Sequence, residues 1–167
     1  MIGIRPKLYI FDVDGTLHWT RTPGQHCPFA ADEWGLMPNV AQVLRAIPWT
    51  EESPWLAIAS DQPGVGDNII SRGIAHQMLF DAVHAAIGYL PPRMRIEMCV
   101  CPDDRECSRK KPNAGMLLAL LQHFSVAATD AVFVGDQRVD AQAALIAGVP
   151  FVWQGDFFKH PRMRSGV

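Results

Sequence analysis

The chain has 167 residues, the usual size of one domain, and its formal net charge at neutral pH is −2. Apolar residues make up 49% and charged residues 19%, a balance typical of a globular protein and not of a disordered or fibrous one. We therefore predict a single domain over residues 1–167, and the net charge gives no general attraction to nucleic acid.

Five short apolar segments have the composition of buried strands. They are rich in β-branched or aromatic residues, and Gly, Pro or polar residues bound each of them. In chain order these segments are Leu8–Phe11, Trp55–Ala59, Ile96–Val100, Ala131–Val134 and Phe151–Trp153.

Between these strands, apolar residues recur at helical spacing. Strands that alternate with helices and have no polar face predict an α/β fold with a parallel sheet of about five strands and helices on both faces. Ligands of such sheets bind at the carboxyl ends of the strands. The helical groups are Val40, Val43, Leu44 and Ile47; Ile69, Ile70 and Ile74; Met116, Leu117, Leu120 and Leu121; and Ala141, Ala144, Leu145 and Ile146.

Two carboxylates follow the first predicted strand. Asp12 and Asp14 are separated by one residue, and Gly15 lets the chain turn away after them. Two acids at a strand tip can share a cation, and Mg²⁺ prefers oxygen ligands. The alternative for this pair alone is an ordinary turn with solvated acids.

Three further polar features occur at or just beyond predicted strand ends. Ser60 ends the second strand, Lys111 precedes a helical run, and Asp136 and Asp140 follow the fourth strand. Taken singly, Ser60 is an ordinary strand-end serine and Lys111 a solvated lysine. The ordered set favours phosphoryl transfer, because a lysine and a divalent cation neutralise charge on phosphoryl oxygens.

This order resembles the four motifs of the haloacid dehalogenase (HAD) superfamily, from Asp12-x-Asp14-Gly15-Thr16 to Gly135-Asp136-x3-Asp140. The resemblance implies a phosphatase in which Asp12 is the nucleophile and forms an aspartyl-phosphate. Asp14 would protonate the leaving oxygen and then activate water.

The resemblance also implies the other site residues. Ser60 and Lys111 would hold the phosphoryl oxygens. The Asp12 carboxylate, the Asp14 backbone carbonyl and Asp136 would bind Mg²⁺, with Asp140 supporting it.

The loops indicate a HAD protein without a cap domain, because the His18–Met37 loop and residues 101–110 are too short to form one. The chain is most similar to the small capless group that includes histidinol-phosphate and heptose-bisphosphate phosphatases. Asp61 stands where that group has asparagine. The resemblance lies in Ser60-Asp61-Gln62-Pro63-Gly64-Val65 and Arg109-Lys110-Lys111-Pro112-Asn113-Ala114-Gly115-Met116.

Several members of that group hold a structural zinc in the loop before the lysine. Cys101 and Cys107 match two of its ligands, whereas Asp103 and Arg109 stand in place of the other two. A four-ligand site would then need Cys99 or another residue. The alternative is a shortened loop with reduced thiols.

A small phosphate ester, such as a sugar phosphate or histidinol phosphate, is the expected substrate. A polynucleotide 3′-phosphatase is an alternative, since the basic residues Arg105 and Arg109–Lys111 could meet nucleic-acid phosphate. His18 and Trp19 either contact a leaving group or pack on the surface.

Two readings of a different class are a phospho-accepting receiver domain and a non-catalytic phosphate-binding or regulatory protein on the HAD scaffold. A receiver needs an acid at the third strand, where this chain has Cys99-Val100-Cys101. The sequence shows neither a signal peptide nor the ~20-residue apolar run of a membrane span, so we expect a cytoplasmic protein. It does not indicate an oligomeric state.

Overall fold

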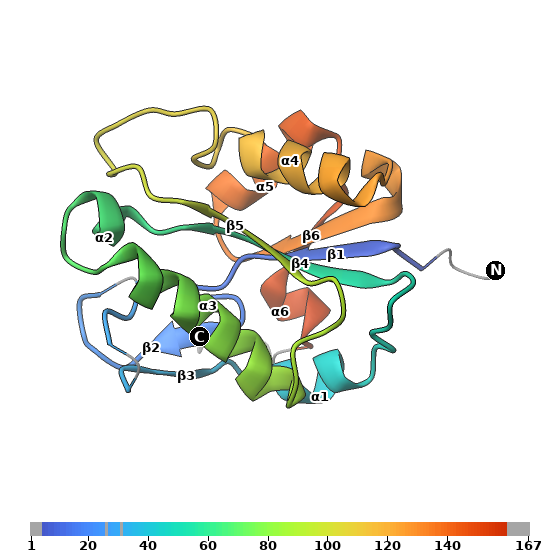
Figure 1. Cartoon of the computed structure of the whole chain (residues 1–167), viewed down its shortest axis with the longest axis horizontal. Coiled ribbons are helices and arrows are strands. Elements are labelled where there is room, and N and C mark those ends of the chain that lie inside the picture. The colour runs from blue at the N-terminus through green and yellow to red at the C-terminus, as the bar shows by residue number, and fades with distance from the viewer. Residues whose placement is uncertain (1–4, 26, 31, 160–167) are drawn as a thin grey trace, which may run out of the picture.

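A computed structural model describes residues 5–25, 27–30 and 32–159. Its centre is a parallel sheet of five strands in the order β5-β4-β1-β6-β7 (Figure 1). The predicted α/β fold is therefore confirmed. The strands are β1 (Leu8–Phe11), β4 (Trp55–Asp61), β5 (Arg95–Cys99), β6 (Ala131–Gly135) and β7 (Phe151–Trp153).

Helices cover both faces of the sheet (Figure 1). One face carries α1 (Val40–Arg45), α3 (Arg72–Ile87) and α6 (Gln154–Phe157), and the other carries α4 (Gly115–Phe124) and α5 (Arg138–Ala147). Two short helices, α2 (Pro63–Gly66) and the 3₁₀ turn η1 (Ala128–Asp130), lie in connections. The helices thus leave the carboxyl ends of the strands available for a site.

Alternate residues of the central strand enter two separate cores. Phe11 of β1 packs in the core on the α3 side, whereas Leu8 and Ile10 pack in the core on the α4 side. This follows from the two-residue period of a strand, which turns successive side chains to opposite faces. A strand buried on both faces must be apolar throughout, which is why the sequence predicts it well.

The region expected to be a loop from His18 to Met37 contains a small antiparallel hairpin. Its strands are β2 (His18–Thr20) and β3 (Trp34–Leu36), and the hairpin lies beside α3 (Figure 1). Among the described residues, this hairpin is the only sheet structure between β1 and α1, and residues 101–110 hold neither helix nor strand. The expectation of a protein without a cap domain is therefore confirmed.

Some expected apolar helix faces point to solvent instead. Ile69 and Ile74 are 57% and 52% exposed, because α3 begins only at Arg72 and turns a later set of residues to the sheet. In α5, Leu145 is 81% exposed, and the small side chains of Ala143 and Ala144 make the buried face. The buried face of α3 consists of Ala75, Met78, Leu79, Ala82, Val83, Ala86 and Ile87.

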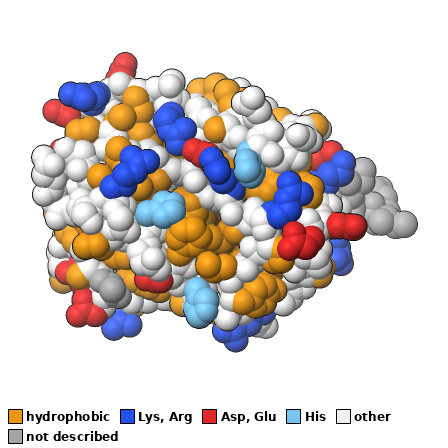
Figure 2. Space-filling view, viewed as in Figure 1, with side chains coloured by type: hydrophobic (Ala, Val, Ile, Leu, Met, Phe, Trp, Pro, Cys, Tyr) orange, Lys and Arg blue, Asp and Glu red, His pale blue; other side chains and the backbone are white. Residues whose placement is uncertain are grey.

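The surface mixes side-chain types. On the face in Figure 2, basic side chains are separated from one another by hydrophobic, histidine and neutral ones. Trp49 is buried and donates from Nε1 to the Leu44 carbonyl at 2.9 Å. No helix in the described part of the chain has the length and apolarity needed to cross a membrane.

Candidate active site

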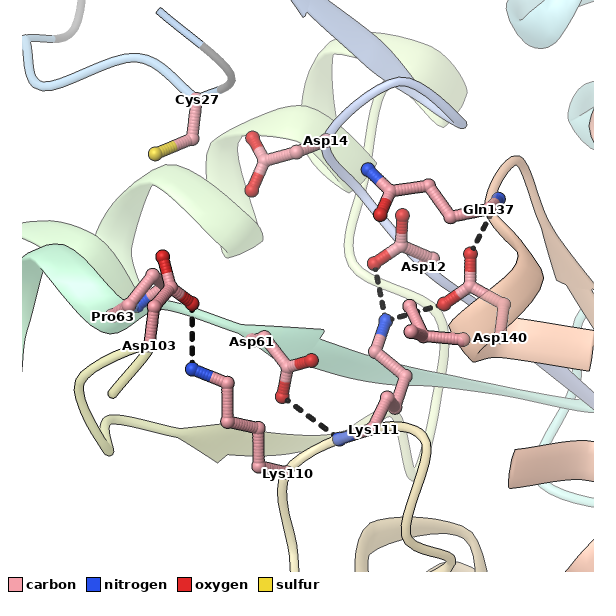
Figure 3. Close-up of a pocket in the computed structure, with 11 residues that line it drawn as sticks. Asp12, Asp14, Cys27, Asp61, Pro63, Asp103, Lys110, Lys111, Gln137 and Asp140 are labelled. Carbon is pink, nitrogen blue, oxygen red and sulfur yellow. Dashed lines mark hydrogen bonds and ion pairs between the residues drawn. The ribbon is translucent and has the colours of Figure 1, made fainter. Parts of the chain in front are cut away.

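A cavity of about 340 Å³ opens at the carboxyl ends of the central strands. The loops after β1 and β6 and the segment before α4 meet there, because parallel strands all end at the same edge of the sheet. Figure 3 shows residues from these segments facing one another across the cavity. The lining residues are Asp12, Asp14, Cys27, Asp61, Pro63, Asp103, Lys110, Lys111, Gln137, Val139 and Asp140.

Lys111 lies between two buried carboxylates. Its Nζ donates to Oδ1 of Asp12 at 2.8 Å and to Oδ1 of Asp140 at 2.7 Å (Figure 3). Burial alone would lower the pKa of Lys111, but the charges of Asp12 and Asp140 outweigh it and raise the pKa above its usual range. Lys111 is therefore a fixed cation beside Asp12.

Asp140 is held rigidly at the start of α5. Its Oδ2 accepts hydrogen bonds from the backbone N–H groups of Asp136 at 3.1 Å and Gln137 at 3.0 Å, as part of a capping box. A side chain at Gly135 would collide with Asp140, since an added Cβ would lie 2.6 Å from the Asp140 Cβ. The glycine thus lets the helix start close to the strand end.

Asp12, Asp136 and Asp140 form an acidic group. One carboxylate oxygen of each lies within 4.8 Å of the others. Burial first, and then the negative charge of Asp140, raise the pKa of Asp136. A cation would relieve this repulsion, and an all-oxygen donor set suits a hard divalent ion, so these residues fit Mg²⁺.

Asp14 lies on another side of the cavity and is held by two side chains. Its Oδ1 lies 2.6 Å from His18 Nε2, and its Oδ2 accepts from Gln62 Nε2 at 2.7 Å. The same Gln62 nitrogen donates to Ser60 Oγ at 2.9 Å. Ser60 is fully buried and does not line the cavity, so its assignment as a phosphate ligand stays a prediction.

Asp61, which replaces the asparagine of the related group, also lines the cavity. Its Oδ1 accepts from the backbone N–H of Lys111 at 3.4 Å. Burial raises its pKa, and the nearby cation of Lys111 opposes that rise. The extra carboxyl therefore meets a donor and a cation, which offset its negative charge.

Two residues around Asp14 received no firm role from the sequence. The sequence places Gln62 in a motif without a role of its own. For His18 it allows either a contact with the leaving group or packing on the surface. In the structure His18 is 1% exposed and contacts Asp14. The four-residue spacing from Asp14 to His18 around a glycine turn is the signal that could have found this contact.

The cysteine loop brings three thiols together. Sulfur atoms of Cys99, Cys101 and Cys107 lie within 4.8 Å of one another, and Cys99 and Cys107 are 3.4 Å apart. Hydrogen bonds, foremost from Cys101, lower the pKa of Cys107 to about 7, whereas burial raises that of Cys99 to about 12. Three thiols of this kind could hold zinc with one position left open.

Asp103 does not join the thiols, contrary to the expected ligand set. Its side chain is 80% exposed and accepts from Lys110 Nζ at 2.6 Å. Arg109, in the position of the last ligand, donates to Glu97 Oε2 at 2.6 Å. Asp103 and Arg109 thus each form an ion pair outside the thiol group, which is why, among the described residues, the group contains only the three cysteines.

The features that define a HAD-type phosphatase are present together. They are a five-stranded parallel sheet, two acids after its first strand, a buried lysine, and two acids after β6. Residues 7–158 match the family described as polynucleotide kinase 3 phosphatase. The chain belongs to this family.

Relatives of known activity are similar over most of the chain. A D-glycero-beta-D-manno-heptose-1,7-bisphosphate 7-phosphatase of Pseudomonas putida is 30% identical over 151 residues, which cover 85% of this chain and 78% of the relative. The enzyme of the same name from Pseudomonas aeruginosa is 31% identical over 119 residues, or 68% of this chain and 62% of the relative.

A solved structure has the same fold. The D,D-heptose 1,7-bisphosphate phosphatase of B. bronchiseptica, complexed with magnesium and phosphate, superposes with a TM-score of 0.73 at 23% identity. The match covers 96% of this chain and 90% of that one. At this identity the likeness establishes the architecture alone.

Proposed function

We propose that this phosphatase is a magnesium-dependent phosphomonoesterase that acts on a phosphorylated sugar through an aspartyl-phosphate on Asp12. The observation that carries the proposal is the position of Asp12. Its buried carboxylate follows the central strand, contacts the Lys111 cation at 2.8 Å and lies within an acidic group suited to a divalent ion.

The reaction has two displacements at phosphorus. In the first, an Asp12 oxygen bonds to phosphorus, the ester P–O bond breaks, and Asp14 gives its proton to the leaving oxygen, which departs as an alcohol. In the second, Asp14 takes a proton from water, the water oxygen bonds to phosphorus, and the Asp12–phosphorus bond breaks. Inorganic phosphate leaves, and both carboxyl groups return to their starting states.

Charge neutralisation supports both displacements. Lys111 is already positioned beside Asp12 and would face the phosphoryl oxygens. The Asp12 and Asp136 carboxylates and the Asp14 backbone carbonyl would hold Mg²⁺, with Asp140 supporting them. When bound, the ion supplies positive charge next to the phosphoryl group.

Sugar bisphosphates are the proposed substrate class. Two relatives that are 30% and 31% identical are named as heptose-1,7-bisphosphate 7-phosphatases, and the structurally similar B. bronchiseptica protein is complexed with magnesium and phosphate. Lys110 lines the cavity and could meet a second phosphate. Lys110 pairs with Asp103, whose side chain is 80% exposed, so this contact would have to open for Lys110 to meet a phosphate.

A polynucleotide 3′-phosphatase is the second candidate, because the description of the matching family names that activity. The cavity has no cap domain in the described residues, so it is accessible to a polymer end as well as to a small ester.

Phosphate release with heptose 1,7-bisphosphate, histidinol phosphate and a 3′-phosphorylated oligonucleotide tests both candidates. We expect Mg²⁺-dependent turnover, fastest on the heptose bisphosphate, and a loss of at least about a thousandfold in Asp12→Asn. Asp81→Asn is the matched control. Asp81 lies on the exposed side of α3, and its only side-chain hydrogen bond among the described residues is with Gln77. Turnover by Asp12→Asn at the wild-type rate would refute the mechanism, and preference for the oligonucleotide would refute the substrate class.

A further inference from the structure

We propose that His18 is a positioning residue that holds the Asp14 carboxyl group in place for both proton transfers. This inference rests on the proposed function, because it concerns the residue assigned to proton transfer there. Its direct basis is the 2.6 Å contact between His18 Nε2 and Asp14 Oδ1.

His18 is placed for this contact by the backbone. It begins β2, and its carbonyl accepts from the Gly15 N–H at 2.8 Å while its own N–H donates to the Val13 carbonyl at 3.1 Å. These bonds close the turn that carries Asp14. The hairpin register then pairs His18 with Leu36 of β3, which fixes the backbone of His18 on its other side.

The ring has little freedom to move. The His18 side chain is 1% exposed, and its ring centroid lies 5.0 Å from that of Trp34. A buried ring packed on an aromatic surface loses the alternative rotamers that a loop histidine would keep. The nitrogen that contacts Asp14 is therefore presented in a fixed direction.

Stability does not explain why a histidine occupies this position. Among the described residues, His18 Nδ1 is buried and has no hydrogen-bond partner. An unpartnered buried polar atom destabilises the folded state, and an apolar side chain of similar size would avoid that cost. A histidine at this position is thus poorly explained by stability, and the contact to Asp14 is the feature that an apolar residue could not provide.

Two side chains together determine the orientation of Asp14. His18 contacts Oδ1 and Gln62 contacts Oδ2, so the plane of the carboxyl group is fixed by contacts at both oxygens. A general acid must lie within hydrogen-bond reach of the oxygen it protonates, and a small misplacement of a reacting group slows the reaction strongly. If the His18 contact is lost, Gln62 is the only side chain among the described residues that still holds the Asp14 carboxyl group.

Pre-steady-state kinetics with p-nitrophenyl phosphate test the inference. Its leaving group departs without a proton, so formation of the aspartyl-phosphate needs little help from Asp14, whereas breakdown by water still needs it as a base. In His18→Leu we expect a burst of about one equivalent of p-nitrophenol, followed by a steady-state rate lowered about tenfold or more, with KM lowered in parallel because breakdown of the aspartyl-phosphate becomes rate-limiting. Asp14→Asn should show the same burst with a slower second phase.

His18→Gln is the matched variant, because its amide can offer an N–H at a reach similar to that of Nε2. We expect it to abolish the burst and to restore most of the steady-state rate. Thermal unfolding of both variants checks that they are folded. Wild-type kinetics in His18→Leu, a slowed first step instead of a burst, or failure of His18→Gln to rescue would each overturn the role of His18 while leaving the phosphatase mechanism intact.

The wild-type protein and Asp12→Asn separate the two proposals. Mg²⁺-dependent turnover by the wild type and none by Asp12→Asn establishes the background on which the His18 variants are interpreted. If Asp12→Asn turns over the ester at the wild-type rate, the nucleophile is wrong and both proposals fail.

Discussion

Lys111 Nζ lies 2.8 Å from Oδ1 of Asp12, although 99 residues separate the two in the chain. Both side chains are buried, so neither charge is solvated as it would be in water. Asp140 contacts the same lysine at 2.7 Å. The proposed active site is therefore also a buried ionic cluster on which local stability depends.

Removing the lysine charge should destabilise the protein as well as inactivate it. In Lys111→Met the carboxylates of Asp12 and Asp140 lose their cation, and breaking a buried pair in this way costs about 3–5 kcal/mol. Urea unfolding in the presence of EDTA measures this cost. Lys7→Met is the control, because its surface pair with Asp130 contributes less than about 1 kcal/mol. Equal stability of the two variants would contradict the buried-cluster interpretation.

Gly15 should control the acidic group through its small size. It has φ +82°, and an added Cβ would collide with the Asp136 carboxylate. We expect Gly15→Ala to weaken Mg²⁺ binding about tenfold or more, measured by calorimetry or by the Mg²⁺ dependence of turnover. Gly24→Ala has a similar φ of +79° but meets no described atom within 4 Å. If Gly15→Ala binds Mg²⁺ as tightly as Gly24→Ala does, the collision with Asp136 does not control the acidic group.

Metal removal should stop turnover reversibly. Protein treated with EDTA is expected to be inactive and to recover when millimolar Mg²⁺ is added. In Asp136→Asn, one carboxylate of the acidic group is lost, so the Mg²⁺ concentration needed for half-maximal turnover should rise about tenfold. Asp130→Asn, which changes only the exposed pair with Lys7, should titrate like the wild type. Full activity in EDTA would exclude a metal-dependent reaction.

The thiols should differ in their pH-dependent reactivity. The pKa of Cys107 is lowered to about 7, whereas burial raises that of Cys27 to about 12. Since the thiolate is the reactive form, alkylation of Cys107 in EDTA-treated protein should increase as the pH rises through about 7 and then level off. Labelling of Cys27 should still be increasing above about pH 9. Peptide mass spectrometry measures both rates, and identical pH profiles would contradict the assigned environments.

Much of the fold was predictable because its central strands β1, β4 and β6 are buried on both faces and are therefore continuous apolar runs. The edge strands β5 and β7 are mostly apolar, and all five strands were predicted with ends within two residues of those observed. The hairpin was missed because neither His18–Thr20 nor Trp34–Leu36 is a continuous run of β-branched or aromatic residues. Exposure of Leu145 shows that helical spacing alone does not decide which face turns inward.

The acids and lysine of the site could be located from the sequence, because residues at the ends of parallel strands are brought to one edge by the fold itself. Asp12, Lys111 and Asp140 meet there as expected. The position of Asp103 in the loop predicts that it joins the thiol group, but its side chain pairs with Lys110 instead. The positions of loop side chains depend on nearby charges and on solvent exposure, and sequence spacing predicts neither.

By itself the sequence determined the alternation of strands and helices and the residues at the strand ends, since both follow from local patterns of apolar and polar residues. Only the tertiary structure decided the strand order β5-β4-β1-β6-β7 and the contact of Asp14 with Gln62. Gln62 is 48 residues from Asp14 in the chain. Such contacts depend on how distant segments pack, because hydrogen bonds between side chains require distances and directions that only the folded chain defines.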